Sequence, residues 1–371
     1  MCSHKMEDEM RGWEKYVRKV EPYVPGEQPK GNRLIKLNTN ENPYPPSPKV
    51  MAALQTMEAD ALRKYPDPAS GGLKEALARY YGLETNQVFV GVGSDDVLGM
   101  AFLTFFNADK PILFPDVTYS FYPVWAGLFR IPYVCPPLDA GFGLHKEDYF
   151  RENGGIIFPN PNAPTGIALA LEEIEEIVRR NKDVVVIVDE AYIDFGGQSA
   201  LALAKRYENL LVVQTFSKSR SMAGVRIGYA MGSPALIEAL ENVRYSYNSY
   251  TMNLPSQILG VEAVRDQAYF AESVGKIVTT REETKGWLRE MGFSFPDSRA
   301  NFIFASHEKV DAAKLFNALK QEEIYVRYFK QPRLENFLRI TIGTDEEMNQ
   351  LREFLERYTL SDAVRPRPAG T

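Results

Sequence analysis

Two charged residues follow apolar stretches that are typical of buried strands. Asp189 comes directly after Val184–Val188, where every residue is apolar, and this pattern predicts a strand buried on both faces. Lys218 follows a second apolar run, Leu210–Val213, after a short loop. One interpretation is a structural ion pair, because a buried carboxylate needs a cationic partner. The other is a reactive site, since ligands of open α/β sheets bind beyond the carboxyl ends of the strands.

A third segment could hold a phosphate group. The sequence GVGSDD, Gly91–Asp96, comes after a predicted strand and opens a predicted helix, whose first-turn N–H groups could bind an anion near Ser94 and Asp95. An ordinary helix cap explains the same residues. Asp96 stands where a dinucleotide-binding fingerprint has its third glycine, so that motif is excluded. The sequence also has no GxxxxGK[ST] loop and no GxSxG motif.

Together with two tyrosines and a further cation, these residues fit pyridoxal phosphate. Lys218 could bind the cofactor covalently, and Asp189 could keep its pyridine nitrogen protonated. Tyr119 could stack on the ring, and the hydroxyl of Tyr192 could hydrogen-bond the ring's 3-oxygen. Arg226 and the helix N–H groups could hold the phosphate. The combination favours a cofactor site over a set of separate structural contacts.

The composition excludes several classes of protein. Of the 371 residues, 44% are hydrophobic and 25% are charged, which excludes a disordered chain and a long coiled coil. The net charge of −6, without a block of Lys and Arg, argues against a nucleic-acid partner. No apolar run approaches about 20 residues, so we expect no membrane span. Two cysteines and three histidines without metal-type spacing predict no disulfide framework and no metal site, and fit a cytoplasmic protein.

From about residue 80, short apolar runs alternate with amphipathic stretches, which predicts an α/β domain with a mostly parallel sheet. The predicted strands are Gln87–Val90, Pro111–Phe114, Gly155–Phe158, Val184–Val188, Leu210–Val213 and Arg226–Met231. Ser70 could cap a helix over Leu73–Tyr81, and Gly82 could end it. Leu171–Asn181 is acidic early and basic late, as a helix dipole prefers.

The C-terminal third predicts a smaller α+β domain. Residues from about 255 to 292 hold one long helical pattern. It is followed by predicted strands and helices at Asn301–Ala305, Ala312–Gln321, Ile324–Tyr328, Phe337–Ile342 and Asp345–Tyr358. We therefore expect an N-terminal arm over residues 1–44 that contributes to the small domain, a large domain over 45–260 and a small domain over 261–371.

The motifs and their order resemble the fold-type I pyridoxal-phosphate aminotransferases, and within them the histidinol-phosphate aminotransferases. The likeness runs from about Leu37 to Gly343. It rests on LNTNENPYPPSP, RKYPDP, GVGSDD, DVTYSFY, PNAPTG, DEAYIDF, TFSKSRSMAGVRIGY, NSYT, NFIFA and LRITIGT. It implies the fold of those enzymes and pyridoxal 5'-phosphate as the cofactor.

The resemblance also implies a role for each matching residue. The catalytic residues would be Lys218, Asp189 and Tyr192. The other cofactor-binding residues would be Ser94, Asp95, Tyr119, Asn162, Ser217, Arg226 and, across a dimer interface, Tyr65. The substrate would contact Tyr23, Asn42, Arg327 and Arg339, with Arg339 pairing with its α-carboxylate. Relatives often contact the 3-oxygen through an asparagine where this chain has Ala163, so Asn162 is the candidate replacement.

The implied activity is transfer of an amino group from histidinol phosphate to 2-oxoglutarate, by a homodimer with shared active sites. A phosphothreonine decarboxylase or an aromatic-amino-acid aminotransferase could use the same scaffold. For the latter, Tyr245, Tyr247 and Tyr250 are candidates to line the pocket. A non-catalytic, cofactor-binding regulator would need a DNA-binding helix, and the segment before the large domain lacks a basic recognition helix.

Overall fold

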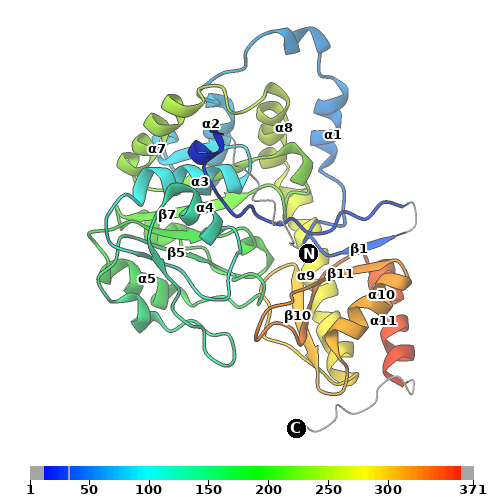
Figure 1. The fold of residues 1–371 in the computed structure, drawn as a ribbon. Helices are drawn as coiled ribbons and strands as arrows, with labels where there is room; N and C mark the ends of the chain where they lie inside the picture. Colours follow the sequence, from blue (N-terminus) through cyan, green and yellow to red (C-terminus); the bar gives the residue numbers. More distant parts are fainter. Residues whose placement is uncertain (1–11, 32–33, 361–371) are drawn as a thin grey trace, which may run out of the picture.

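The computed structural model describes residues 12–31 and 34–360, which form two β-sheets with helices packed around them (Figure 1). Within those ranges, no helix is both long enough and apolar enough to cross a bilayer. The same ranges hold no cluster of His, Cys, Asp and Glu side chains that could bind a metal ion. The outer ends of the predicted arm and of the predicted small domain lie outside the described residues.

The larger sheet has seven strands, and all but one run parallel to one another. The exception is β8, which lies antiparallel between two parallel strands. In spatial order the strands are β2 (Val88–Gly91), β8 (Gly228–Met231), β7 (Leu210–Thr215), β6 (Val186–Asp189), β5 (Ile156–Pro159), β3 (Ile112–Leu113) and β4 (Tyr133–Val134). The mostly parallel sheet was predicted, whereas β4 was not, because Tyr133 and Val134 are both exposed and give no buried apolar pattern.

Helices cover both faces of this sheet, so the larger part of the molecule has three layers (Figure 1). On one face lie α1 (Pro48–Gln55), α2 (Gly71–Tyr81), α5 (Leu171–Arg180), α6 (Leu201–Ala204) and α8 (Leu254–Arg265). On the other lie α3 (Ser94–Phe105), α4 (Tyr122–Phe129) and α7 (Pro234–Tyr247). The strand β6 shows why both faces are apolar: Val186 and Val188 pack in the first core and Ile187 in the second.

Local sequence signals explain the bounds of α2 only in part. Gly82 ends it in the left-handed conformation, with a φ of 62°, as predicted. Ser70 stands at the N-cap position but gives no side-chain cap. The side chain of Asp67 caps the helix instead, since its Oδ2 accepts a hydrogen bond of 2.6 Å from the N–H of Gly71. The prediction of a Ser70 cap was therefore wrong, because a carboxylate three residues earlier reaches the same end of the helix.

The smaller sheet has five strands in the order β1 (Ile35–Leu37), β11 (Ile324–Tyr328), β12 (Phe337–Thr341), β10 (Phe302–His307) and β9 (Phe293–Ser294). β1, from the N-terminal arm, joins this sheet by pairing parallel to β11. The helices α9 (Gln267–Glu290), α10 (Ala312–Gln321) and α11 (Asp345–Leu360) bury their apolar faces against the sheet in a core of their own. β10, α10, β11, β12 and α11 follow the sequence prediction to within two residues at each end.

The long helical pattern near residues 255–292 is two helices and not one. The break lies at Asp266, which ends α8 and precedes α9. α8 belongs to the larger core, through Leu259 and Ala263, whereas α9 belongs to the smaller one, through Ile277 and Leu288. The predicted boundary at 260/261 falls inside α8, and the division of the chain into domains stays a prediction.

Candidate active site

A cavity of about 300 Å³ lies where the carboxyl ends of β5, β6 and β7 face the smaller sheet. Eleven of the residues singled out from the sequence line it: Tyr23, Ser94, Asp95, Tyr119, Asp189, Tyr192, Ser217, Lys218, Arg226, Arg327 and Arg339. They come from the N-terminal arm, from the loops after the large-sheet strands and from β11 and β12. The residues singled out from the sequence therefore meet in the wall of one cavity, although they are up to 316 positions apart.

Asp189 ends β6 as a carboxylate buried to 4% exposure. Its Oδ2 accepts a hydrogen bond of 2.9 Å from the hydroxyl of Tyr122, and its Oδ1 accepts one of 3.2 Å from the N–H of Ala191. Burial nevertheless raises the pKa of Asp189 to about 6, because neither donor carries a positive charge. Among the described residues, no Lys or Arg forms an ion pair with Asp189, so the structural Asp–Lys interpretation is wrong. A cationic ring nitrogen would supply the missing charge.

Lys218 lies three residues beyond the end of β7, and its amine faces the same cavity. Its Nζ donates a hydrogen bond of 3.1 Å to the carbonyl oxygen of Thr39 and lies 5.8 Å from the centre of the Tyr192 ring. The hydroxyl of Tyr192 accepts a hydrogen bond of 2.9 Å from Nδ2 of Asn40. The amine is thus held by a neutral carbonyl oxygen, which leaves it available to bond an aldehyde carbon.

The predicted anion site is the N-terminus of α3. Gly93 precedes it with a φ of 86°, and a Cβ there would lie 2.4 Å from Nη2 of Arg226, so only glycine lets that guanidinium approach. The same guanidinium donates to Oγ of Ser217 at 3.4 Å and lies 3.6 Å from Oδ2 of Asp95. First-turn N–H groups, a hydroxyl and a guanidinium therefore converge, as a phosphate requires.

Tyr119 and Thr118 line the wall between this anion site and Asp189. The hydroxyl of Tyr119 donates a hydrogen bond of 2.9 Å to Oδ1 of Asp95, and burial raises the pKa of the Tyr119 phenol, which stays protonated. Oγ1 of Thr118 is buried without a hydrogen-bond partner among the described residues. A buried hydroxyl of this kind needs a partner from within the cavity.

The far end of the cavity is cationic. Arg339, in β12, is partly buried, and its Nη2 donates a hydrogen bond of 3.0 Å to the carbonyl of Asn38. Its Nε is buried without a partner in the described part of the chain, and burial lowers the pKa of the guanidinium, with a smaller contribution from Arg327 nearby. Tyr23 lies beside them, stacked on Phe121 at 4.7 Å between ring centres. Two arginines that form no ion pair with any described carboxylate are suited to an anionic substrate.

Two predicted residues do not reach the cavity. Both donors of Asn162 are used elsewhere, on the carbonyl of Val117 at 3.0 Å and on Oγ1 of Thr165 at 3.1 Å, and Ala163 lines the wall in its place. Asn42 is also turned away, since its Nδ2 donates to the carbonyl of Ser219 at 3.2 Å. The Nδ2 groups of Asn162 and Asn42 therefore hold loops and do not face the cavity, while Oδ1 of Asn162 is buried without a partner among the described residues.

The remaining predicted aromatics lie on the surface. Tyr65 is 81% exposed and stacks on Tyr250, with 4.5 Å between ring centres. Tyr245 and Tyr247 are also exposed, at 46% and 75%. None of the four lines the cavity of this chain. Tyr245, Tyr247 and Tyr250, named as candidates to line the pocket, do not line the cavity within this chain, because the end of α7 and the residues after it lie away from it.

Sequence reasoning missed the residues that orient the reactive groups. Tyr122 is fully buried at the start of α4. The DVTYSFY motif could have indicated it, because Tyr122 comes three residues after Tyr119, a spacing that places both side chains on one side of a turn. Asn40 gave no signal, since its partner Tyr192 is 152 residues away. Thr39 contributes only a carbonyl oxygen, which no side-chain pattern reveals.

Comparisons with known proteins agree with this geometry. Residues 32–355 match the family described as "Aminotransferase class I and II". The chain belongs to this family. A histidinol-phosphate aminotransferase of Hydrogenovibrio crunogenus is 55% identical over 339 residues, which is 91% of this chain and 95% of the relative. One of Lactococcus lactis is 51% identical over 346 residues, 93% of this chain and 97% of the relative.

Solved structures show the same fold. The structure of a histidinol-phosphate aminotransferase from Sinorhizobium meliloti, in complex with pyridoxal-5'-phosphate, superimposes with a TM-score of 0.79 at 24% identity, over 88% of this chain and 90% of that one. That of Clostridium acetobutylicum gives a TM-score of 0.81 at 22% identity, over 88% and 99%. The predicted fold is thereby confirmed. This aminotransferase uses pyridoxal phosphate.

The cavity fits that cofactor on its own chemistry. Asp189 lacks a cation at the place where a pyridinium nitrogen would supply one. The seat formed by α3, Ser217 and Arg226 would take the phosphate. Lys218 would bind the aldehyde carbon. The Thr118 hydroxyl, which has no hydrogen-bond partner among the described residues, could bond a polar atom of the ligand.

Proposed function

We propose that this aminotransferase transfers the amino group of histidinol phosphate to 2-oxoglutarate, giving imidazole-acetol phosphate and glutamate in histidine biosynthesis, and that it does so in the cytoplasm. The names of the relatives that are 51–55% identical support the substrate. The observation that carries the proposal is the cationic end of the cavity, where Arg327 and Arg339 face the lysine from the smaller sheet. Both substrates are anionic, and one pocket must hold each in turn.

Each residue then has a task. Pyridoxal phosphate, when bound, supplies an electron sink for the bonds at the substrate's α-carbon. Asp189 keeps a proton on the pyridine nitrogen, and Tyr122 fixes the carboxylate's orientation through its hydroxyl. The amine of Lys218, once displaced, removes the α-proton as a general base and returns it as a general acid. Tyr192, oriented by Asn40, donates to the ring oxygen.

Arg339 binds the α-carboxylate of glutamate and 2-oxoglutarate, since a guanidinium pairs with a carboxylate through two parallel hydrogen bonds and the buried Nε has no partner among the described residues. Histidinol phosphate has no carboxylate, so Tyr23, Arg327 and Arg339 bind its phosphate in one half-reaction and the carboxylates of the acidic substrate in the other. Both arginines are partly buried, and their guanidinium groups lie 5.4 Å and 5.6 Å from the centre of the Phe329 ring. The same two cations thus serve both anionic substrates in turn.

The direct test compares amino donors in single half-reactions. Purified enzyme is mixed with histidinol phosphate, phosphothreonine, phenylalanine or glutamate, and the absorbance of the bound cofactor is followed. We expect fast conversion with histidinol phosphate and glutamate, and slow conversion with phenylalanine, which has neither a phosphate nor a side-chain carboxylate. Release of carbon dioxide from phosphothreonine at a higher kcat/KM than conversion of histidinol phosphate would contradict the proposal.

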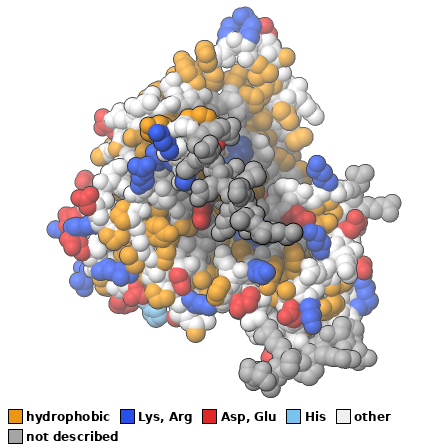
Figure 2. All heavy atoms as spheres, in the orientation of Figure 1, with side chains coloured by type: hydrophobic (Ala, Val, Ile, Leu, Met, Phe, Trp, Pro, Cys, Tyr) orange, Lys and Arg blue, Asp and Glu red, His pale blue; other side chains and the backbone are white. Residues whose placement is uncertain are grey.

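We further propose a homodimer in which Tyr65 of one subunit completes the phosphate site of the other. Tyr65 is directed outward among other exposed apolar side chains, Met51, Leu54 and Leu62. Figure 2 shows hydrophobic side chains gathered on this upper part of the molecule, where Figure 1 places α1. Closed two-fold dimers are also the commonest homo-oligomers.

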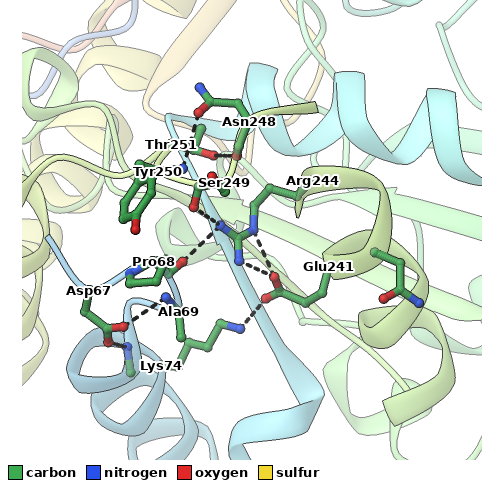
Figure 3. Close-up of polar contacts among 12 residues, drawn as sticks. Asp67, Pro68, Ala69, Lys74, Glu241, Arg244, Asn248, Ser249, Tyr250 and Thr251 are labelled. Atoms are coloured by element: carbon green, nitrogen blue, oxygen red, sulfur yellow. Dashed lines mark hydrogen bonds and ion pairs between the residues drawn. The ribbon is translucent and has the colours of Figure 1, made fainter. Parts of the chain in front are cut away.

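A polar cluster holds the Tyr65 loop in this outward position (Figure 3). Nη1 of Arg244, a buried residue of α7, donates to the carbonyls of Pro68 at 3.0 Å and Ser249 at 3.2 Å. Its Nε donates to Glu241 at 2.9 Å, and Glu241 also pairs with Lys74 of α2. The stacked pair of Tyr65 and Tyr250 is thereby supported from behind, which suits a surface that another subunit contacts.

Subunit complementation tests the shared site. Lys218→Ala and Tyr65→Ala chains are inactive or impaired alone, and mixing them places both lesions in one site of a heterodimer and leaves the other intact. We expect activity to recover on subunit exchange. No recovery in confirmed heterodimers would mean that Tyr65 serves its own subunit. Tyr65→Phe, which removes one hydrogen bond, should weaken cofactor binding only about 2- to 12-fold.

A further inference from the structure

A polar contact outside the cavity joins the two segments that carry Lys218 and Tyr192. Oγ of Ser219 donates a hydrogen bond of 2.5 Å to Oδ2 of Asp194. Ser219 follows Lys218 directly, and Asp194 comes two residues after Tyr192 in the turn Ile193–Phe195. Neither Ser219 nor Asp194 lines the cavity, so this contact acts on the site only through the backbone.

The contact is enclosed. Ser219 is 3% exposed, and burial raises the pKa of Asp194 although the Ser219 hydroxyl and the nearby charge of Arg220 both favour the carboxylate. Arg220 itself is committed elsewhere: it donates to the carbonyl of Ala263 at 2.8 Å and stacks on Phe270 at 4.1 Å. Ser219 is therefore the side chain that links this carboxylate to the lysine segment.

Ser219 is held at its backbone as well. Its carbonyl oxygen accepts the hydrogen bond from Nδ2 of Asn42, and Oδ1 of Asn42 in turn accepts one of 3.0 Å from the N–H of Tyr44. Asn42, which was expected to contact the substrate, thus holds the Ser219 peptide in place instead. The peptide after Lys218 is fixed from the turn 193–195 on one side and from the loop 38–48 on the other.

Lys218 needs such support. Its amine has one described hydrogen-bond partner, the carbonyl of Thr39, and a lysine side chain is otherwise free to rotate. A general base must lie within hydrogen-bond reach of the proton that it removes, and a misplacement of about 1 Å can slow a reaction about 100-fold. The position of the Lys218 backbone relative to the cofactor's ring is therefore a determinant of rate.

We propose that Asp194 is a positioning residue of this enzyme: through Ser219 it sets the place of Lys218 relative to Tyr192. Because Asp194 and Tyr192 share one short turn, the Asp194–Ser219 hydrogen bond fixes the separation between the lysine amine and the tyrosine hydroxyl. The inference rests on the proposed role of Lys218 as the base.

The test uses full-length holoenzyme with Ser219→Ala or Asp194→Ala, and L-glutamate as the amino donor. We expect each change to slow the half-reaction about 10-fold while KM stays within about 2-fold, since the substrate's contacts are untouched. The kinetic isotope effect with α-deuterated glutamate should rise, and the pH at which the bound cofactor's absorbance changes should shift. The double variant should be no slower than the slower single variant, since both changes remove one contact.

Ser199→Ala is the matched control. It removes the same kind of hydrogen bond, of 2.7 Å from a serine hydroxyl to a buried carboxylate, Glu190, in a neighbouring loop that does not carry Lys218. We expect its rate, isotope effect and absorbance titration to match the parent enzyme. A Ser219→Ala enzyme with full cofactor content and unchanged kinetics would overturn the proposal, as would equal losses in Ser199→Ala. Because glutamate is the donor, the outcome does not depend on whether histidinol phosphate is the other substrate.

Discussion

The two ends of the cavity are built differently. At the cofactor end, the side chains are already bonded to one another: Tyr122 to Asp189, Tyr119 to Asp95 and Arg226 to Ser217. At the substrate end, Arg327 and Arg339 form no ion pair with a described carboxylate, and Nε of Arg339 has no partner.

The difference follows from what each end must bind. The cofactor end holds one permanent group, so its donors and acceptors can be fixed in advance and lose little on binding. The substrate end must accept two molecules in alternation, and charges that were already paired within the protein would have to be separated each time. We therefore expect substitutions at the cofactor end to slow every half-reaction by the same factor, and substitutions at the substrate end to weaken substrate binding by factors that can differ between substrates.

Asp189→Asn should show the largest effect. A neutral amide cannot keep the pyridine nitrogen protonated, and loss of such electrostatic stabilisation slows a chemical step by about 10²- to 10³-fold. Much of the cofactor should remain bound, because the phosphate seat and Lys218 are unchanged. Stopped-flow half-reactions with both donors measure this, and the two should slow by the same factor. A loss confined to one donor would show that the two ends are not separate.

Without the cofactor, Asp189 has no cationic partner, and the free energy of unfolding should therefore depend on pH. The native pKa of about 6 lies above the ordinary value of 3.8, so the carboxyl group stabilises the cofactor-free fold below about pH 4 and loses this contribution as the pH rises through 6. The difference corresponds to at most about 3 kcal/mol. Denaturant unfolding between pH 5 and about 7.5 checks this.

The control is the same measurement on Asp189→Asn. Glu190, whose pKa burial raises to about 7, acts in the same direction, so the variant should keep part of the slope and lose the rest. Identical slopes in the two proteins would show that Asp189 is not the group responsible. With the cofactor bound, the slope from Asp189 should disappear, since the pyridinium charge keeps it ionised.

Arg339→Lys should raise KM for both substrates with the cofactor's absorbance unchanged. Lysine keeps the charge but lacks the planar fork, and one lost charge-assisted hydrogen bond of about 1.5–3 kcal/mol corresponds to about a 10- to 150-fold loss in kcat/KM. Steady-state kinetics with histidinol phosphate and 2-oxoglutarate measure it. A changed absorbance in the resting enzyme would mean that Arg339 supports the cofactor instead.

Tyr23→Phe should have the smallest effect and the most selective one. It removes one hydroxyl from the substrate end and keeps the stacking on Phe121, so kcat/KM for histidinol phosphate should fall by about 2- to 12-fold, the value of one hydrogen bond. Conversion of phenylalanine, which has no phosphate, should be unaffected. An equal loss with both donors would place Tyr23 outside the phosphate contacts.

The sequence by itself predicted the residues of the proposed cofactor end, because Asp189, Lys218, Ser94 and Arg226 each lie within a few residues of a strand end. A strand's carboxyl end is a local feature, read from apolar runs and turns, and parallel strands bring such ends together at one edge of the sheet. The cationic residues of the substrate end were available only through the resemblance to known aminotransferases.

The tertiary structure alone decided which side chains orient the reactive groups. Asn40 reaches Tyr192 across 152 residues and Asp194 reaches Ser219 across 25, and neither separation repeats in a period that a sequence pattern could show. The direction of an amide is also a tertiary property: Asn162 and Ala163 are adjacent in the chain, but only Ala163 faces the cavity, because Val117 and Thr165 bind the Asn162 amide. Strand ends are set by local sequence, whereas hydrogen-bond partners are set by packing.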